Sequence, residues 1–229
     1  MIRVGIVTGM ISEASCLDQL PATDAQYCDL RFCAGGSPGR AESGAENLLA
    51  DGAGALISFG VAGALDPQLR PGDLLVADTI VSGDGNRYDT TPAWSDGVAR
   101  TFEAATTVRR GVIATTETPI ITAEAKRSTG RALGAIAVDM ESARVAAAAA
   151  RGGIPFIAIR AIGDPASRDL PKAALAGLAP DGATRPAAVI AQLALRPWDL
   201  LSLIQLGKET ARALKTLRRI AALGLRSGL

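Results

Sequence analysis

Short apolar runs alternate with alanine-rich stretches along most of the chain, and this alternation is the feature that most restricts the fold. The apolar runs are rich in β-branched residues and predict strands near Arg3–Val7, Ala55–Phe59, Asp73–Val81, Gly111–Thr115, Ala135–Val138 and Ile154–Ile162. The alanine-rich stretches predict helices at about Ser12–Leu20, Arg40–Ala50, Thr122–Leu133 and Met140–Arg151. Because the strands are apolar on both faces, they fit a sheet that is covered by helices on each side. We therefore predict an α/β domain over residues 1–195, a three-layer sandwich with a mixed, largely parallel central sheet.

The last part of the chain has a different pattern. Pro171–Pro186 is typical of a loop, and a long amphipathic helix is predicted from Trp198 onward, so residues 196–229 are assigned to a C-terminal helix. Its basic residues recur at spacings that keep them on one helical face, Lys208, Arg212, Lys215, Arg219 and Arg226. A different face carries Leu203, Leu214, Leu217 and Ala221.

The charge of the chain is divided unevenly. Residues 207–229 hold six Lys or Arg and one Glu, a net charge of +5, whereas the rest holds 18 basic and 22 acidic residues, a net charge of −4. Two interpretations of this basic C-terminal helix stay open. It packs on the domain with a solvated basic face, or it is attracted to anionic lipid headgroups at a membrane surface.

Composition excludes several classes of function. The chain has no histidine, which rules out a Ser-His-Asp hydrolase and a His-ligated zinc site, so we expect no metal and no cofactor. With 24 basic and 23 acidic residues, bulk charge argues against a nucleic-acid partner. The three cysteines have no CxxC spacing, and no apolar stretch is long enough to span a bilayer. These observations predict a cytoplasmic protein whose proton chemistry falls to carboxylates.

Three carboxylates occupy positions where a predicted strand ends and the next segment begins. Glu13 follows the first strand, Glu141 stands between a strand and a helix, and Asp164 comes directly after a later strand. The carboxyl ends of strands in an open α/β sheet are where ligands bind, so the three side chains are expected to converge. Each also fits a structural role, because acids are favoured in the first turn of a helix and Asp before Pro is common in turns.

The blocks that contain these residues resemble the nucleoside phosphorylase and nucleosidase superfamily, particularly methylthioadenosine/S-adenosylhomocysteine nucleosidases. The resemblance runs from Ile2 to about Ser167 and is carried by GMISEA, SFGVAGALDPQLRPGDLLVAD and AVDMESARVAAAAARGGIPFIAIRAIGDPA. Within the superfamily, the SPGRA turn and the RPWDLLSLIQLGKE segment are most similar to the hopanoid-associated phosphorylase group, which is linked to removing adenine from adenosylhopane. The resemblance implies a phosphorylase/hydrolase-like fold and a homo-oligomer.

The resemblance also implies a role for each matching residue. Asp164 would protonate the departing purine, and Glu13 would orient and deprotonate the attacking water. The substrate-binding residues would be Met140, Glu141, Ile120, Gly60 and Val61: Met140 packs on the ribose, Glu141 accepts from the ribose diol, the Ile120 backbone recognises adenine, and the glycine turn that contains Gly60 and Val61 meets the nucleophile. This pattern favours hydrolysis of the N-glycosidic bond of a 5′-substituted adenosine.

A phosphate-dependent reaction with inorganic phosphate as co-substrate is the alternative. It would need cationic donors, for which Arg40 and Arg87 are the candidates. Val61 stands where many members of the family have Ser or Thr, which removes a hydroxyl from a phosphate site, and Pro119 replaces an aromatic residue that stacks on adenine. Shorter loops before Cys33 and around Gly83–Pro92 would leave the ribose 5′ side open to a bulky lipid substituent.

Two further alternatives belong to other classes. A Rossmann dehydrogenase is disfavoured because the first glycine turn, VTGMIS, lacks GxGxxG. A non-catalytic nucleoside-binding or membrane-adaptor protein could keep the fold without the activity. Retention of Glu13, Glu141 and Asp164 together favours the enzyme. The expected partners are thus a small-molecule or lipid-linked nucleoside and, in the membrane interpretation, an anionic bilayer.

Overall fold

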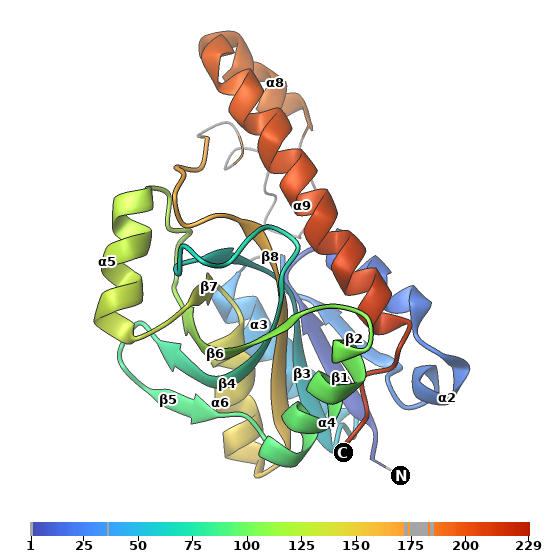
Figure 1. Ribbon diagram of the computed structural model, residues 1–229. Helices are drawn as coiled ribbons and strands as arrows, with labels where there is room; N and C mark the ends of the chain where they lie inside the picture. Colours follow the sequence, from blue (N-terminus) through green and yellow to red (C-terminus); the bar gives the residue numbers. More distant parts are fainter. Residues whose placement is uncertain (1, 36, 172–173, 175–182, 184–185) are drawn as a thin grey trace.

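The computed structural model describes the whole chain except residues 1, 36, 172–173, 175–182 and 184–185. Within the described part, eight strands form one sheet (Figure 1). They are β1 Val4–Thr8, β2 Leu30–Cys33, β3 Ala55–Ala64, β4 Leu74–Ser82, β5 Arg87–Asp89, β6 Val108–Thr115, β7 Ala137–Asp139 and β8 Phe156–Asp164.

The pairing of the strands is mixed and largely parallel, as predicted. β1 lies between β2 and β3 and is parallel to both, and β6 is parallel to β4 and β7. β8 runs parallel to β3 and antiparallel to β4, and the other antiparallel pairs are β3 with β7 and β4 with β5. As a result β1, β3 and β8 end at the same edge of the sheet, where Glu13 follows β1 and Asp164 ends β8. Glu141 follows β7, which is antiparallel to β3.

Helices cover both faces of this sheet. The described helical segments are α1 Ile11–Ala14, η1 Ser15–Gln19, α2 Ala22–Ala25, α3 Pro38–Ala50, α4 Pro92–Glu103, α5 Ala123–Leu133, α6 Ser142–Gly152, α8 Pro186–Leu195, η2 Pro197–Asp199 and α9 Leu200–Ala221. α3 and α6 pack on one face, and η1, α4 and α9 pack on the other. β3 serves both cores, since Leu56 belongs to the first whereas Ile57 and Phe59 belong to the second.

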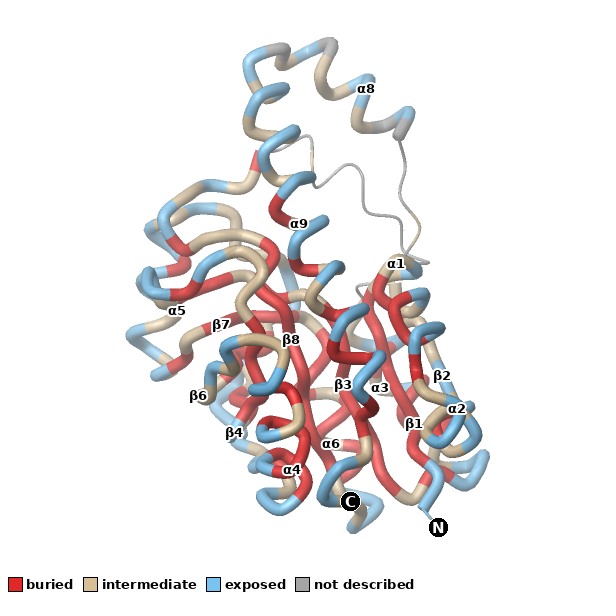
Figure 2. The backbone as a smooth tube through the Cα atoms, turned by 45° about the vertical axis from the view of Figure 1, so that its right-hand side comes forward, coloured by how far each residue is buried: buried red, intermediate tan, exposed pale blue. Residues whose placement is uncertain are grey.

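The C-terminal helix α9 is an integral part of the second core. Ala213, Leu217 and Ile220 are fully buried there, and the Thr216 hydroxyl donates to the Gly72 carbonyl at 2.8 Å. The first turns of α9 and the whole of α8 extend beyond the sheet (Figures 1 and 2). No helix in the described ranges combines the length and the hydropathy that a bilayer-spanning segment requires.

The elements differ from the prediction in several places. The helix expected over Ser12–Leu20 is divided into α1 and η1, and the elements that were not predicted are β2, β5, α2, α4 and α8. α4 carried a readable signal, because Trp94, Val98 and Phe102 recur at four-residue spacing after a proline at its start. Most of the predicted loop Pro171–Pro186 lies outside the described residues.

Candidate active site

A cavity of about 210 Å³ opens at the edge of the sheet where β1, β3 and β8 end. Six of the residues that the sequence predicted for the site line it, Glu13, Val61, Ile120, Met140, Glu141 and Asp164. They come from segments that are far apart in the chain. The sheet order brings these segments together, as expected for residues at strand ends.

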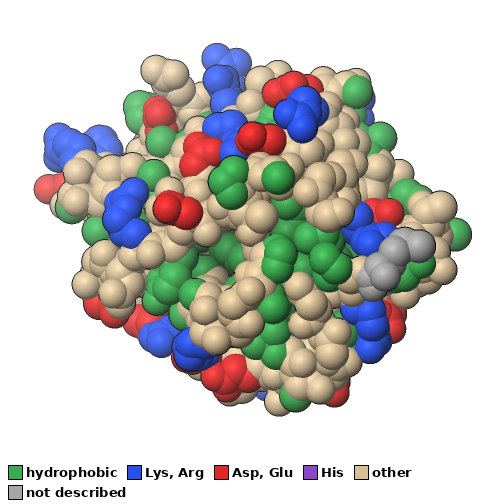
Figure 3. Space-filling view, turned by 90° about the horizontal axis from the view of Figure 1, so that it is seen from below, with side chains coloured by type: hydrophobic (Ala, Val, Ile, Leu, Met, Phe, Trp, Pro, Cys, Tyr) green, Lys and Arg blue, Asp and Glu red, His purple; other side chains and the backbone are tan. Residues whose placement is uncertain are grey.

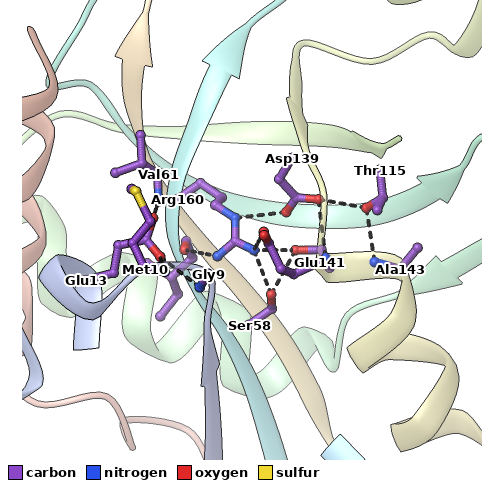
Figure 4. Close-up of polar contacts among 12 residues, drawn as sticks. Gly9, Met10, Glu13, Ser58, Val61, Thr115, Asp139, Glu141, Ala143 and Arg160 are labelled. Atoms are coloured by element: carbon purple, nitrogen blue, oxygen red, sulfur yellow. Dashed lines mark hydrogen bonds and ion pairs between the residues drawn. The ribbon is translucent and has the colours of Figure 1, made fainter. Parts of the chain in front are cut away.

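Glu13 is held by three backbone N–H groups. As the third residue of α1 it accepts through Oε2 from Gly9 and Met10, each at 2.8 Å, which caps the start of the helix. Oε1 accepts from the N–H of Val61 in β3, also at 2.8 Å (Figure 4). Burial raises the pKa of the Glu13 carboxyl, while Arg160 and these N–H donors act in the opposite direction. The carboxylate is therefore fixed in position and is more basic than an exposed one.

Glycines allow the carboxylates to lie directly against the strands. A Cβ on Gly60 would come within 2.7 Å of the Glu13 carboxyl carbon, and a Cβ on Gly9 within 2.7 Å of Oε1 of Glu141. A Cβ on Gly63 would lie 3.1 Å from Oδ1 of Asp164. Gly60 therefore acts by leaving space for Glu13, since it is not among the residues that line the cavity.

Glu141 precedes α6 and is almost fully buried. Burial raises the pKa of its carboxyl to about 8, Arg160 opposes this rise, and the negative charges of Asp139 and Glu13 add to it. The Arg160 guanidinium lies 3.7 Å from Oε2 of Glu141. The raised pKa favours the protonated form of Glu141, whereas the role implied by the family resemblance is that of an ionised acceptor.

Arg160 is a buried cation that the sequence analysis missed. It lies in the middle of β8, where Nε donates to Asp139 at 2.8 Å and Nη2 donates to Ser58 and Ser142 at 2.7 and 3.0 Å (Figure 4). A charge inside an otherwise apolar strand run was the signal that could have identified it, because such a charge must find buried partners. Its positive charge limits the build-up of negative charge between Glu13 and Glu141.

Asp164 ends β8 and contacts a second residue that the sequence analysis missed, Lys126 of α5. Only 1% of the Lys126 side chain is exposed, and its Nζ donates to Asp164 and to the carbonyls of Pro165 and Arg168 at 2.9 and 3.0 Å. Burial raises the pKa of the Asp164 carboxyl and the Lys126 charge opposes that rise. No local pattern singles out Lys126, because α5 is polar along most of its length.

The two arginines proposed for phosphate do not line the cavity. Arg40, in α3, donates to the carbonyls of Ala34 and Cys33 at 3.0 and 3.3 Å, and Arg87 is exposed on β5. Among the described lining residues, Lys126 is the only cation. Likewise, the part of the chain that the structure describes contains no group of Cys, Asp or Glu side chains arranged to hold a metal ion.

Three carboxylates in distinct surroundings, two of them buried and Asp164 partly buried, allow acid and base functions to be divided at one site. Glu13 is presented as an ionisable acceptor on backbone N–H groups, and Glu141 lies between acids and a buried arginine. Asp164 lies against a buried lysine. Such differences in surroundings are typical of catalytic carboxylates.

Comparisons with known proteins identify the family and the fold. The family model described as "Phosphorylase superfamily" matches residues 32–195. The fold is similar to that of a methylthioadenosine nucleosidase mutant from Helicobacter pylori with 5′-methylthioadenosine in its active site, with a TM-score of 0.68, 19% identity, and 96% of this chain and 98% of that chain covered. It is also similar to S-adenosylhomocysteine nucleosidase from Streptococcus pyogenes, with a TM-score of 0.67, 22% identity and 96% of each chain covered.

Futalosine hydrolase from Helicobacter pylori is a further structure with this fold, with a TM-score of 0.67, 20% identity, and 96% of this chain and 97% of that chain covered. No curated protein sequence matches the chain. The family model covers well over half of the residues and includes every segment that lines the cavity except the one with Glu13. The chain therefore belongs to the phosphorylase superfamily, and this membership supports an enzyme that cleaves N-ribosyl bonds.

Proposed function

We propose that the protein cleaves the N-glycosidic bond of a 5′-substituted adenosine and releases adenine. The observation that carries this proposal is the convergence of Glu13, Glu141 and Asp164 on one cavity, each with a raised pKa; the first two are buried and Asp164 is partly buried. Cleavage of this bond builds positive charge on the ribose and negative charge on the purine. Carboxylates of differing proton affinity can stabilise both charges.

In the proposed reaction Asp164 donates a proton to the leaving purine. Its burial favours the protonated form that a general acid needs, and Lys126 holds the side chain in one position. Glu141 binds the ribose hydroxyls, and this binding favours its ionised form because the hydroxyls donate to a carboxylate. The developing ribosyl cation strengthens that interaction further. Met140 and Ile120 line the cavity beside these groups and would contact the ribose and the adenine.

We propose water as the nucleophile, activated by Glu13. The backbone N–H groups hold the Glu13 carboxylate in place, and burial makes it a stronger base. A phosphate dianion would need cationic donors in the cavity. The lining cation among the described residues, Lys126, is already bound by Asp164 and two carbonyls, and Arg40 and Arg87 lie elsewhere. These observations support hydrolysis over phosphorolysis.

The 5′ substituent that we propose is a polycyclic hydrocarbon, with adenosylhopane as the substrate and ribosylhopane as the product. The cavity of about 210 Å³ is smaller than the ~300–1,000 Å³ typical of pockets that enclose a drug-sized ligand. A nucleoside with a large hydrocarbon would therefore leave that hydrocarbon outside. The solved nucleosidase with this fold holds 5′-methylthioadenosine, a nucleoside with a small substituent.

The decisive experiment measures adenine release from adenosylhopane and from a soluble 5′-alkyl adenosine, with and without inorganic phosphate. We expect full activity without phosphate and a free ribosyl product identified by mass. Strict phosphate dependence with a ribose-1-phosphate product would instead establish a phosphorylase. Asp164→Asn is expected to abolish release of adenine. If the wild type and Asp164→Asn were both inactive on all 5′-substituted adenosines, a non-catalytic binding protein would be favoured.

A further inference from the structure

Large hydrophobic side chains gather at the exposed end of the α8–α9 hairpin. We call this surface the apolar tip, made of Ile190, Leu195, Trp198, Leu200, Leu201 and Ile204. Leu201 is 79% exposed and Trp198 is 67% exposed. In Figure 2 this end of the hairpin is pale or intermediate, whereas the second half of α9 contains buried positions. These six side chains therefore contribute little to the core.

Among the described residues, large and strongly exposed hydrophobic side chains are close together in the sequence only at the tip. The other large hydrophobic side chains that the described residues expose are Ile2, Ile11 and Leu223, which are separate from one another in sequence. Single exposed hydrophobic residues are ordinary, but a contiguous cluster usually marks an interaction surface. Water contact with six such side chains is costly, so the tip is expected to have an occupant.

Positive charge continues from the tip along the solvent side of α9. Lys208, Arg212, Lys215 and Arg219 are all exposed there. Figure 3 views the molecule from the end away from the tip, where acidic and basic side chains lie side by side around a central hydrophobic area. The combination of exposed Trp and Leu with a stripe of Lys and Arg is typical of segments that insert into the interface of an anionic bilayer.

The tip also lies on the side of the molecule where the cavity opens. α8 and the first turns of α9 project beyond the edge of the sheet at which α1 follows β1 (Figures 1 and 2). The cavity is at that edge, and Leu170, on the segment that follows β8, lines it. A flat surface that contacts the tip would consequently lie at the same end of the molecule as the cavity.

We propose that the apolar tip docks on an anionic lipid bilayer and presents the cavity to a nucleoside whose lipid part stays in that bilayer. The second half of this inference rests on the proposed function, whereas the docking itself does not. A second copy of the chain is a poorer occupant. A two-fold symmetric contact places the same patch on both partners, which would bring two basic stripes together. Anionic headgroups complement the basic residues of the stripe nearest the tip, Lys208 and Arg212, at about 1 kcal/mol for each Lys or Arg near the surface.

The test is cosedimentation with vesicles, using the full chain. We expect binding to vesicles of phosphatidylglycerol and phosphatidylcholine, with little binding to phosphatidylcholine alone. Trp198→Ser combined with Leu201→Ser should weaken binding roughly tenfold or more, because the apolar insertion is lost. Lys208→Glu combined with Arg212→Glu should also weaken it, and this effect should diminish at high salt. Leu223→Ser, an exposed residue outside the tip, is the matched control and should bind like the wild type.

Thermal unfolding confirms that each variant is folded, and release of adenine from a soluble 5′-alkyl adenosine separates docking from catalysis. Loss of vesicle binding with unchanged soluble turnover supports the proposal. Binding by the tip variant equal to that of the wild type would overturn it. So would a wild-type dimer that ignores vesicles and becomes monomeric in the tip variant, since the occupant would then be a second copy. Failure of the proposed function would show as absent turnover of the soluble nucleoside, whatever the vesicle result.

Discussion

Residues without side chains shape the chemistry of this site as much as the carboxylates do. Gly60 is the clearest case, because a Cβ there would lie 2.7 Å from the Glu13 carboxyl carbon. Glu13 cannot move away from this position without losing hydrogen bonds, since its two carboxylate oxygens accept from three backbone N–H groups. The position of the proposed base therefore depends on a glycine in the neighbouring strand.

Gly60→Ala is expected to reduce kcat at least tenfold, because the new methyl displaces Glu13 from the nucleophile. The measurement is the rate of adenine release by purified Gly60→Ala, with Gly39→Ala as the control. A Cβ on Gly39 meets nothing within 4 Å, and this glycine lies in α3. The control should retain both activity and stability, because its methyl meets no other atom. Equal activity of the two variants would show that Gly60 is not needed to position Glu13.

Glu141 makes stability depend on pH. Its carboxyl has a pKa of about 8 in the folded chain against an ordinary value of 4.5, so between these values the folded state holds a proton that the unfolded state has lost. The free energy of unfolding should therefore fall as pH rises from about 4.5 to about 8, and then level off. Glu13 and Asp164 also have raised pKa values and add to the same trend.

Between pH 5 and pH 9, the free energy of unfolding of Glu141→Gln should fall by less than that of the wild type, with a difference of roughly a few kcal/mol. Urea unfolding at both pH values measures the difference. The remaining slope belongs to Glu13 and Asp164. If the wild type and the variant lost stability in parallel, Glu141 would not hold a proton in the folded state.

Lys126 adjusts the proposed general acid. It faces Asp164 from α5, and Glu209 of α9 and Arg168 are the other charged groups near that carboxyl. Removing the lysine charge should raise the pKa of Asp164 further. Lys126→Met is therefore expected to move the alkaline limb of the kcat/KM profile up by about one pH unit or more. Lys215→Met, which removes an exposed lysine, is the control, and an unshifted limb in Lys126→Met would make Lys126 a purely structural residue.

At the scale of elements, the C-terminal segment after α9 closes the second core. The Trp94 indole donates to the Leu225 carbonyl at 2.9 Å, and the Leu225 N–H donates to Asp24 at 2.7 Å. Leu225 is fully buried, and the chain passes so close to Gly97 of α4 that a Cβ there would overlap the Ser227 carbonyl. The last residues therefore fasten α4 to α9, and deleting 207–229 would remove core rather than a separate tail.

Gly97→Ala tests this contact. It should destabilise the fold by about 1–3 kcal/mol, since overpacking forces the backbone of the terminal segment to shift. Gly207→Ala places a methyl on α9 with nothing within 4 Å and should be neutral or slightly stabilising. Denaturant unfolding of both variants gives the difference. If Gly97→Ala had the same free energy of unfolding as Gly207→Ala, the terminal segment would not pack on α4.

Elements with a strong local pattern were predicted, and those that depend on distant partners were not. The runs that became β1, β3, β4 and β8 are apolar on both faces, which is readable from the chain. β2 and β5 are short and only partly buried, so their pairing with β1 and β4 decides their conformation. The predicted first helix is divided at Ser15, where α1 ends and the 3₁₀ helix η1 begins.

At the scale of the whole molecule, the net charge of +1 does not show how unevenly the charged side chains are distributed. The near-zero sum hides a basic stripe on α9 that leads away from an apolar tip. The buried charges are paired inside, Arg160 with Asp139 and Lys126 with Asp164. Pairing of this kind is what allows charged groups to stay in an apolar interior.

The sequence alone determined the α/β class, the absence of imidazole chemistry, and the candidates Glu13, Glu141 and Asp164. These follow from local patterning and from which residue types are present. Only the tertiary structure decided that Arg160 and Lys126 lie against those acids, that Arg40 and Arg87 do not line the cavity, and that α9 belongs to the core. Proton affinity and burial depend on neighbours from distant segments, and the packing of the chain decides which neighbours meet.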